Sequence, residues 1–182
     1  MKKHVLAMVV AATMASAVTM NAQAESTTVT VSGGTVNFVG QVVNAACSVA
    51  ADSVDQTVIL SQVRTVKLTE SGMLANQKED FHIKLEDCDT SVSQNAAVIF
   101  NAQQDATQPG AMANTAGAGS ALNVALQLFG PDGKKLDLGT TSSAIGLING
   151  ENIIPLSVDY IATGAATPGN VASTATFQMV YS

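Results

Sequence analysis

The last fourteen residues of the chain read GNVASTATFQMVYS (residues 169–182), and their pattern is typical of a half-buried β-strand. From Thr174 onward, small or polar residues alternate with Ala175, Phe177, Met179 and Tyr181. Side chains of a strand point to opposite faces in turn, so these four residues share one face. Gly169 stands just before this segment, where a bend would be useful. The pattern predicts a terminal strand with one apolar face.

A second alternating segment lies near the other end of the chain. Residues 28–34 read TVTVSGG, with Val29 and Val31 in phase. Taken alone, this pattern also fits a flexible tail or an ordinary first strand. A strand-like segment at each end nevertheless suggests that one end pairs with a different molecule.

Residues 1–24 have the pattern of a secretory signal. A basic start at Lys2, Lys3 and His4 precedes an apolar run over Val5–Met20. Ala22-Gln23-Ala24 then supplies the small-x-small cleavage pattern. The apolar run is short for a membrane span, and no second candidate of spanning length follows it. We therefore expect an exported protein with one domain after the signal.

The charge balance of the exported chain is acidic. Removing Lys2 and Lys3 from the eight basic residues leaves six against fourteen acidic residues, a net charge of −8. Such a surface argues against nucleic acid and anionic membrane as partners, because both carry negative charge.

The chain contains two cysteines, Cys47 and Cys88, and the exported compartment is oxidising. We expect a disulfide between them, since only one intrachain pairing exists. The alternatives are two free thiols or a metal pair, although no CxxC or Cys/His cluster is present.

Short apolar runs separated by Gly, Pro, Asn and Ser predict an all-β domain, a sandwich or a barrel. The expected strands are Thr35–Val43, Thr57–Leu60, Phe81–Glu86, Ala96–Phe100, Leu122–Phe129, Ile153–Ile161 and Ala172–Tyr181. The run GPDG (residues 130–133) predicts a type I turn in a hairpin. Residues 102–121 lack a strand pattern and are expected to form a surface connection.

Candidates for catalysis are few. After the signal the chain has a single histidine, His82, which any Ser-His-Asp or Cys-His arrangement would have to use. Glu86, Asp87 and Asp89 flank Cys88, but they lack the spacing of a calcium loop. The chain has no Trp and two Tyr, so aromatic platforms for a sugar are scarce. We expect no enzyme, no cofactor and no metal site.

Three stretches together carry a resemblance to a known family. They are GGTVNFVGQVVNAAC (residues 33–47), DCD (residues 87–89) and the ending from Asp159 to Tyr181. The chain resembles the major subunits of type 1 fimbriae, pilins assembled by the chaperone–usher route of Gram-negative bacteria. The resemblance covers essentially all of the chain after the signal.

The resemblance implies an incomplete immunoglobulin-like β-sandwich that lacks its last strand. A periplasmic chaperone would lend that strand, and the N-terminal extension of the next subunit would replace it after passage to an outer-membrane usher. The expected organisation is a signal (1–24), a donor extension (25–34) and a pilin domain (35–182). The expected donor residues are Val29, Val31, Gly33 and Val36. The expected groove-edge motif is Gly169, Phe177, Met179 and Tyr181.

The function implied is that of a structural subunit, exported through the periplasm, in a surface rod that supports adhesion. Its partners would be copies of itself and other pilins. The alternative is a minor adaptor or tip pilin, or a carbohydrate-binding adhesin module of the same system. An adhesin of this kind resembles a two-domain protein, for which this chain is too short.

Overall fold

The computed structural model describes residues 28–40, residue 42 and residues 45–182. The signal expected over residues 1–24 lies outside them. The chain divides into two units, residues 1–41 and residues 42–182.

Residues 28–40 of the first unit form neither strand nor helix, and all of them are exposed. The strand expected over Thr35–Val43 is therefore wrong for residues 35–40 and for Val42, while positions 41, 43 and 44 lie outside the described residues. An extended segment becomes a strand only when a neighbour pairs with its N–H and C=O groups. No described strand pairs with this segment. The boundary expected between Gly34 and Thr35 stays a prediction.

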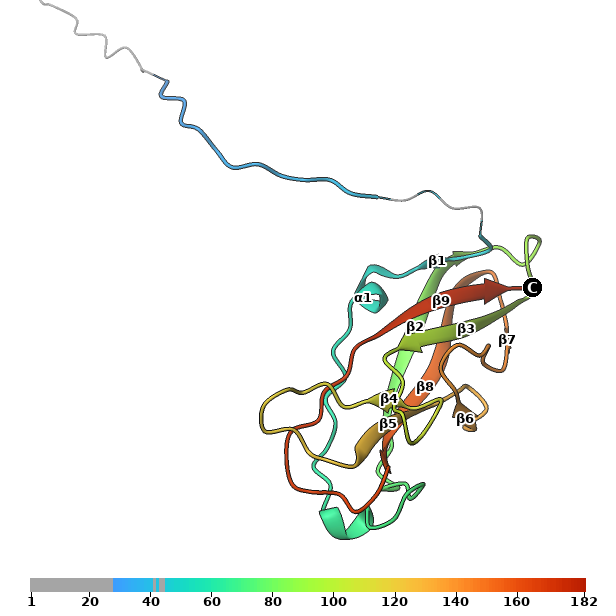
Figure 1. The fold of residues 1–182 in the computed structure, drawn as a ribbon. Helices are drawn as coiled ribbons and strands as arrows, with labels where there is room; N and C mark the ends of the chain where they lie inside the picture. The colour runs from blue at the N-terminus through green and yellow to red at the C-terminus, as the bar shows by residue number, and fades with distance from the viewer. Residues whose placement is uncertain (1–27, 41, 43–44) are drawn as a thin grey trace, which may run out of the picture. The chain divides into compact units, whose positions relative to one another are not determined.

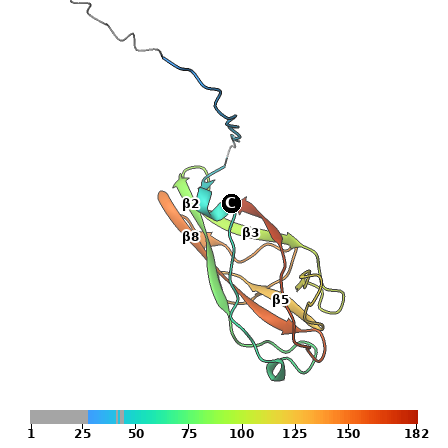
Figure 2. The same ribbon diagram turned by 90° about the vertical axis from the view of Figure 1, so that its left-hand side faces the viewer.

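The second unit is a β-sandwich of two antiparallel sheets (Figures 1 and 2). The larger sheet has the order β1-β2-β8-β5-β4, with β6 paired to β5. Its strands are β1 (Ser48–Val49), β2 (Glu79–Cys88), β4 (Met112–Ala113), β5 (Val124–Phe129), β6 (Lys135–Leu136) and β8 (Gly150–Ala162). The smaller sheet has the order β7-β3-β9, with β3 (Asn95–Ala102), β7 (Ile145–Gly146) and β9 (Ala175–Tyr181). The helices are short, namely α1 (Ala51–Val54) and the 3-10 turn η1 (Thr65–Lys67).

The core lies between the two sheets. On β2, Ile83 and Leu85 are buried, whereas His82 on the opposite face is exposed. Ile83 and Leu85 belong to one hydrophobic cluster with Ile154 of β8 and Phe100 of β3. The period-two burial on β2 is what the sequence predicts for a sheet with one wet face. The all-β sandwich is thus confirmed.

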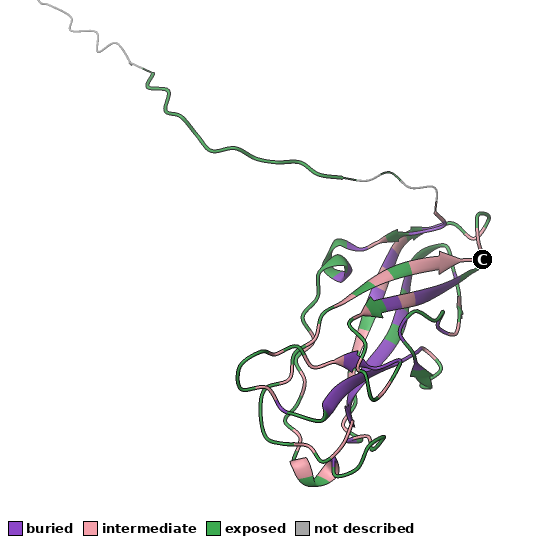
Figure 3. Ribbon diagram, in the orientation of Figure 1, coloured by how far each residue is buried: buried purple, intermediate pink, exposed green. Residues whose placement is uncertain are grey.

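Strand β5 is buried along its whole length on both faces (Figure 3). Its Ala125 packs with Ala111, Ile161 and Leu74 in a second, smaller cluster. This cluster packs on the outer side of β5 and β8, so Ala125 and Ile161 are buried on that side as well.

Most expected strands are confirmed with shifted ends. Phe81–Glu86 lies in β2, Ala96–Phe100 in β3 and Ile153–Ile161 in β8. Leu122–Phe129 and Ala172–Tyr181 are each shorter than expected, because β5 begins at Val124 and β9 at Ala175.

The strand expected over Thr57–Leu60 is wrong. Val58 and Leu60 are half-buried and Ile59 is exposed, so the side chains do alternate. The backbone of this segment has no strand partner, however (Figure 2). On either side of it, side chains make the contacts to β2: Gln56 Nε2 donates to the His82 carbonyl at 2.9 Å, and the Ser61 N–H to Glu79 Oε1 at 3.2 Å.

The connections are partly as expected. The Gly133 N–H donates to the Gly130 carbonyl at 2.9 Å, and β5 and β6 pair on either side of that turn, which confirms the hairpin. Residues 102–121 are more than a surface connection, because they contain β4, whose Met112 is buried. Two residues are too short a strand to leave a recognisable alternation.

A disulfide joins Cys47 to Cys88, 41 residues further along the chain. Cys47 directly precedes β1 and Cys88 is the last residue of β2, so the bond closes one end of the sandwich. The Asp89 N–H donates to the Ala46 carbonyl at 2.8 Å beside it. Within the residues that the structure describes, no helix has the length and apolar character needed to span a membrane.

We expect replacement of both Cys47 and Cys88 by Ser to lower the free energy of unfolding by about 2–4 kcal/mol, because the unfolded chain regains the entropy of an open loop. Denaturant unfolding, compared with the oxidised and the reduced parent chain, measures this. The reduced parent should match the double variant. An unchanged unfolding midpoint in both would contradict the expectation.

Candidate functional site

An open groove of about 730 Å³ lies in the sandwich, with walls formed by residues 53–60 on one side and residues 171–177 on the other. Core side chains of both sheets form its floor: Phe81, Ile83, Phe100, Met112, Leu126, Leu128, Val158 and Tyr160. Asp55 is the one charged residue in the lining. The groove therefore exposes a strip of hydrophobic core along its length.

Strand β9 contributes one wall, and its predicted apolar face is confirmed. Ala175, Phe177, Met179 and Tyr181 are all half-buried and pack against the core cluster, whereas Thr176 and Gln178 between them are exposed (Figure 3). β9 pairs with β3 over its full length, from Ala96↔Tyr181 to Ala102↔Ala175. Its other edge has no partner strand among the described residues. The half-burial thus reflects a core that is covered on one side only.

Three aromatic rings hold the wall to the floor. The rings of Phe100 and Phe177 lie 6.0 Å apart in a tilted arrangement. Phe81 meets Phe100 edge-on at 6.2 Å. Such arrangements are favourable beyond the burial of area. They position β9 over the sheet that carries β2.

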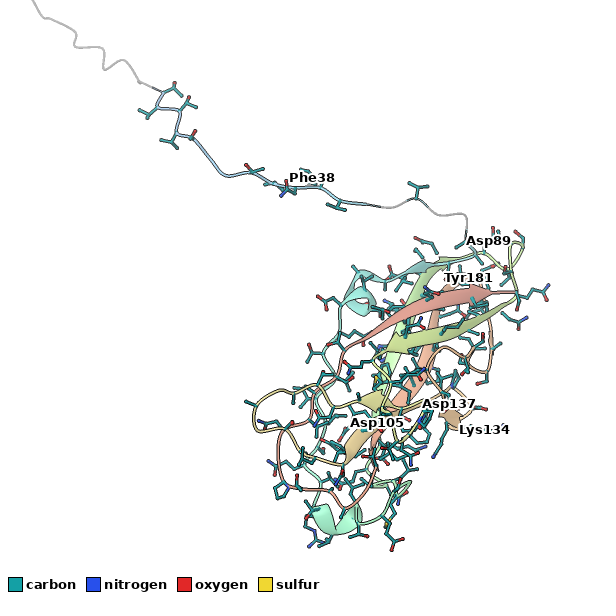
Figure 4. The ribbon with its side chains drawn as sticks, in the orientation of Figure 1. Phe38, Asp89, Asp105, Lys134, Asp137 and Tyr181 are labelled. Carbon is teal, nitrogen blue, oxygen red and sulfur yellow. A yellow bond between two sulfur atoms is a disulfide. The ribbon has the colours of Figure 1, made fainter. Side chains whose placement is uncertain are left out.

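Two tyrosines bring hydroxyl groups to the groove region without bringing charge. The Tyr181 hydroxyl donates to the Cys47 carbonyl at 3.2 Å, which links the end of β9 to the disulfide (Figure 4). Burial raises the pKa of Tyr181. Burial also raises the pKa of Tyr160, and the negative charges of Glu79 and Asp159 add to the effect. Both phenols stay neutral at physiological pH, so the site suits an apolar, uncharged occupant.

Gly169 is required for a close approach of two chain segments. A Cβ at this position would clash with the backbone of Ser120 and Ala121. The next residue, Asn170, makes two backbone hydrogen bonds to the same segment. Its carbonyl accepts from the Ala121 N–H at 2.9 Å, and its N–H donates to the Gly119 carbonyl at 2.8 Å. The expected bend is therefore not the main reason for a glycine here.

Asn114 fastens the same region through its side chain. Its Nδ2 donates to the carbonyls of Ala121 at 2.9 Å and Asn170 at 3.0 Å. Its Oδ1 accepts from the Ala172 N–H at 3.0 Å. We call Asn114, Gly169 and the backbone that they contact the loop clasp. Residues 171–174 line the groove directly after it, so the loop clasp holds that end of the wall in place.

The sequence did not reveal Asn114, Met112, Val58 or Leu60 as parts of a site. Asn114 and Met112 lie in the stretch expected to be a surface connection. Their partners are far away in sequence, and no local pattern marks such contacts.

The expected donor residues lie in the first unit. The side chains of Val29, Val31 and Val36 are 78%, 79% and 71% exposed. A Cβ at Gly33 would meet no atom within 4 Å. The valines are thus exposed apolar residues, and the role of all four residues as a donor strand stays a prediction.

The residues weighed for catalysis or metal binding are not gathered into a site. His82 is exposed on β2. The Asp89 carboxylate accepts the hydroxyl and the N–H of Ser91 at 2.6 and 2.8 Å, and these bonds lower its pKa. Among the described residues, no group of three or more His, Cys, Asp or Glu side chains is arranged to hold a metal ion.

Comparison of the sequence with known proteins identifies the family of the chain. The sequence model of the family described as Fimbrial protein matches residues 36–182. The chain belongs to this family. It is 46% identical over its full length, and the full length of the relative, to a type-1 fimbrial protein A chain of Escherichia coli. It is likewise 45% identical over both full lengths to a fimbrial subunit type 1 of Klebsiella pneumoniae.

Structure comparison agrees at the level of the fold. The P pilus rod subunit PapA superposes with a TM-score of 0.63 at 20% identity, over 76% of this chain and 100% of PapA. The chain is thus an all-β subunit with an incomplete immunoglobulin-like sandwich. Its role is that of a structural fimbrial subunit.

We expect Gly169→Ala to destabilise the sandwich by about 1–3 kcal/mol, because the added methyl group forces the loop clasp apart. Gly146→Ala is the matched control, since a Cβ there would meet nothing within 4 Å. Thermal unfolding of both variants measures the difference. Equal unfolding temperatures for the two variants would show that the close approach at Gly169 is not a constraint.

Proposed function

We propose that this fimbrial subunit polymerises by donor-strand exchange, with the open groove as acceptor and the N-terminal extension of another copy, or of another pilin, as donor. The observation that carries the proposal is the groove itself. It combines a floor of core side chains with a β9 edge to which no described strand pairs. An apolar groove beside a free strand edge fits an added strand, whose backbone pairs with the edge and whose alternate side chains enter the groove.

The extension has the features that such a donor needs. Its Val29 and Val31 project from one face of an extended segment, Gly33 follows in the same phase and Val36 lies further along. Each Val that becomes fully buried contributes roughly 1.5–3 kcal/mol. Hydrogen bonds along β9 add to this, and all of these contacts must break together. A long-lived joint follows without a covalent link.

The unpaired segment at Thr57–Leu60 supports the same assignment. It forms the wall opposite β9 and already has the side-chain alternation of a strand, with Val58 and Leu60 turned toward the core. Only a backbone partner is missing. A donor that lies between this segment and β9 would supply one, and the segment would then become the strand that the sequence predicts.

The same groove serves the steps before assembly in our proposal. A periplasmic chaperone lends a strand to the exported subunit, delivers it to an outer-membrane usher and is replaced there by the next subunit. In our proposal Gly169, Phe177, Met179 and Tyr181 form the edge that the chaperone engages, and Phe177 among them lines the groove itself. The resulting fibre consists of copies of this chain with other pilins and supports adhesion, and the subunit performs no catalysis.

We expect Val29→Asp combined with Val31→Asp to abolish long fibres, because two carboxylates would enter an apolar groove that offers them no partner. Thr30→Asp combined with Ser32→Asp adds the same charge on the other face of the extension and should leave assembly largely intact. Electron microscopy and denaturant-resistant ladders on gels measure fibre length.

Deletion of Ser26–Gly34 tests the same mechanism more severely. That subunit should still fold with a chaperone and accept a donor, yet it has no donor to offer and should form no polymer on its own. Fibres of ordinary length from the deleted subunit alone would overturn the donor role of the extension.

We further expect Phe177→Ser combined with Tyr181→Ser to reduce recovery of the subunit with its periplasmic chaperone by tenfold or more, because the wall loses apolar area and the ring contact to Phe100. Thr176→Ser with Gln178→Ser changes the exposed face of the same strand and is the control. Co-purification of chaperone and subunit provides the measurement. Normal recovery of the first variant would mean that the apolar face only stabilises the subunit.

A further inference from the structure

Asn149 and Gly150 form the single Asn-Gly pair in the sequence. They lie where the chain turns from β7 into β8, at the same end of the sandwich as the disulfide, since Gly150 is the register partner of Cys88. Both residues are exposed. Gly150 has a φ of +93°, which favours glycine at this position. Figure 4 labels Asp89, which lies at this end of the molecule.

Within the part of the chain that the structure describes, the side chain of Asn149 forms hydrogen bonds through its oxygen, Oδ1, and not through its nitrogen. Its Oδ1 accepts both the N–H and the hydroxyl of Thr90, each at 2.9 Å. Among the described residues, its Nδ2 donates no hydrogen bond. Two donors on one carbonyl oxygen draw electron density from the carbonyl carbon and stabilise negative charge on that oxygen. The amide nitrogen, which would be the leaving group, stays free in water.

The turn around this pair is held by a second asparagine. The Asn152 Nδ2 donates to the Ile148 carbonyl at 2.7 Å, and its Oδ1 accepts from the Ile148 N–H at 2.9 Å. Asn152 is buried and both ends of its amide are engaged. It is followed by Ile153, whose branched side chain hinders attack by the next backbone nitrogen. Asn149 differs from Asn152 because, among the described residues, only its oxygen is hydrogen-bonded and because the residue that follows it is glycine.

We propose that Asn149 is a site of spontaneous covalent modification, by deamidation through a cyclic imide with Gly150. The backbone nitrogen of Gly150 bonds to the Asn149 Cγ and loses its proton to solvent. The Cγ–Nδ2 bond breaks, and the nitrogen leaves as ammonia after taking up a proton. A water molecule then opens the ring at either carbonyl and leaves an aspartyl or an isoaspartyl residue at position 149. No oxidant, reductant or enzyme is required.

The modification adds negative charge where the surface is already acidic. Glu86, Asp87, Asp89 and Glu151 flank the site, and Lys84 already binds both glutamates at 3.2 and 2.8 Å. The new carboxylate can still accept from Thr90. Asn149 does not line the groove, so neither this inference nor its test depends on the proposed assembly mechanism.

Peptide mapping by mass spectrometry of the full exported chain, incubated at neutral pH and physiological temperature, tests the site. We expect a gain of one dalton at Asn149, together with an isoaspartyl linkage. The matched probe is a synthetic peptide spanning residues 145–154, which has the same Asn-Gly pair without Thr90. Conversion in the folded chain should be at least as fast as in this peptide.

Two variants identify the cause. Thr90→Val keeps the N–H and the shape but removes the hydroxyl, and it should slow conversion about fivefold, the factor that one net hydrogen bond supplies. Asn149→Gln should abolish the mass gain at this position, because the longer side chain closes a less favourable ring. The proposal is overturned if the folded chain stays unmodified while the peptide converts, or if Thr90→Val converts as fast as the parent chain. The first result would mean that the Thr90 contacts protect the amide, and the second that the Thr90 hydroxyl does not activate it.

Discussion

The pairing of β9 with β3 along one edge only is the constraint on which the rest of the structure depends. An inner strand of a sheet has two neighbours, but among the described residues β9 pairs with β3 alone, and a hydrophobic floor lies open beside it. The chain cannot remove this exposure by local adjustment. Phe177 is already packed on Phe100, and the loop clasp holds the segment before β9 against the β4–β5 connection. The groove is therefore a fixed feature of the fold, and an occupant must come to it.

Both ends of the groove wall are fixed by contacts to the rest of the sandwich. The disulfide closes the end of β2, and Tyr181 ties the end of β9 to the same point. At the other end of the groove, Gly169 and Asn114 perform the corresponding task. A site that must accept an extended chain along its whole length needs both ends of its wall in position beforehand, because ordering them during binding would cost affinity.

The alternation of apolar and polar residues along the sequence predicted the strands correctly where it reflects one buried and one exposed face. The alternation at Ala175, Phe177, Met179 and Tyr181 appears as half-burial on one face of β9, and the strands that form β2, β3, β5 and β8 were found for the same reason. The strand expected over Thr57–Leu60 did not form because no described strand pairs with its backbone, although its side chains alternate as a strand requires. The loop clasp was not predictable, since Asn114 and Asn170 are 56 residues apart and neither has a motif.

The order of the strands along the chain has a consequence for timing. β9 is the last element, yet it pairs with β3, and the register joins Ala97 to Val180. A chain that emerges from its N-terminus first cannot pair β3 with β9 until β9 itself is free. Contacts between segments so distant in sequence form slowly, and the intermediates that precede them expose apolar surface. Every newly made copy therefore passes through an interval in which β3 has no full-length neighbour and both sides of the core are open.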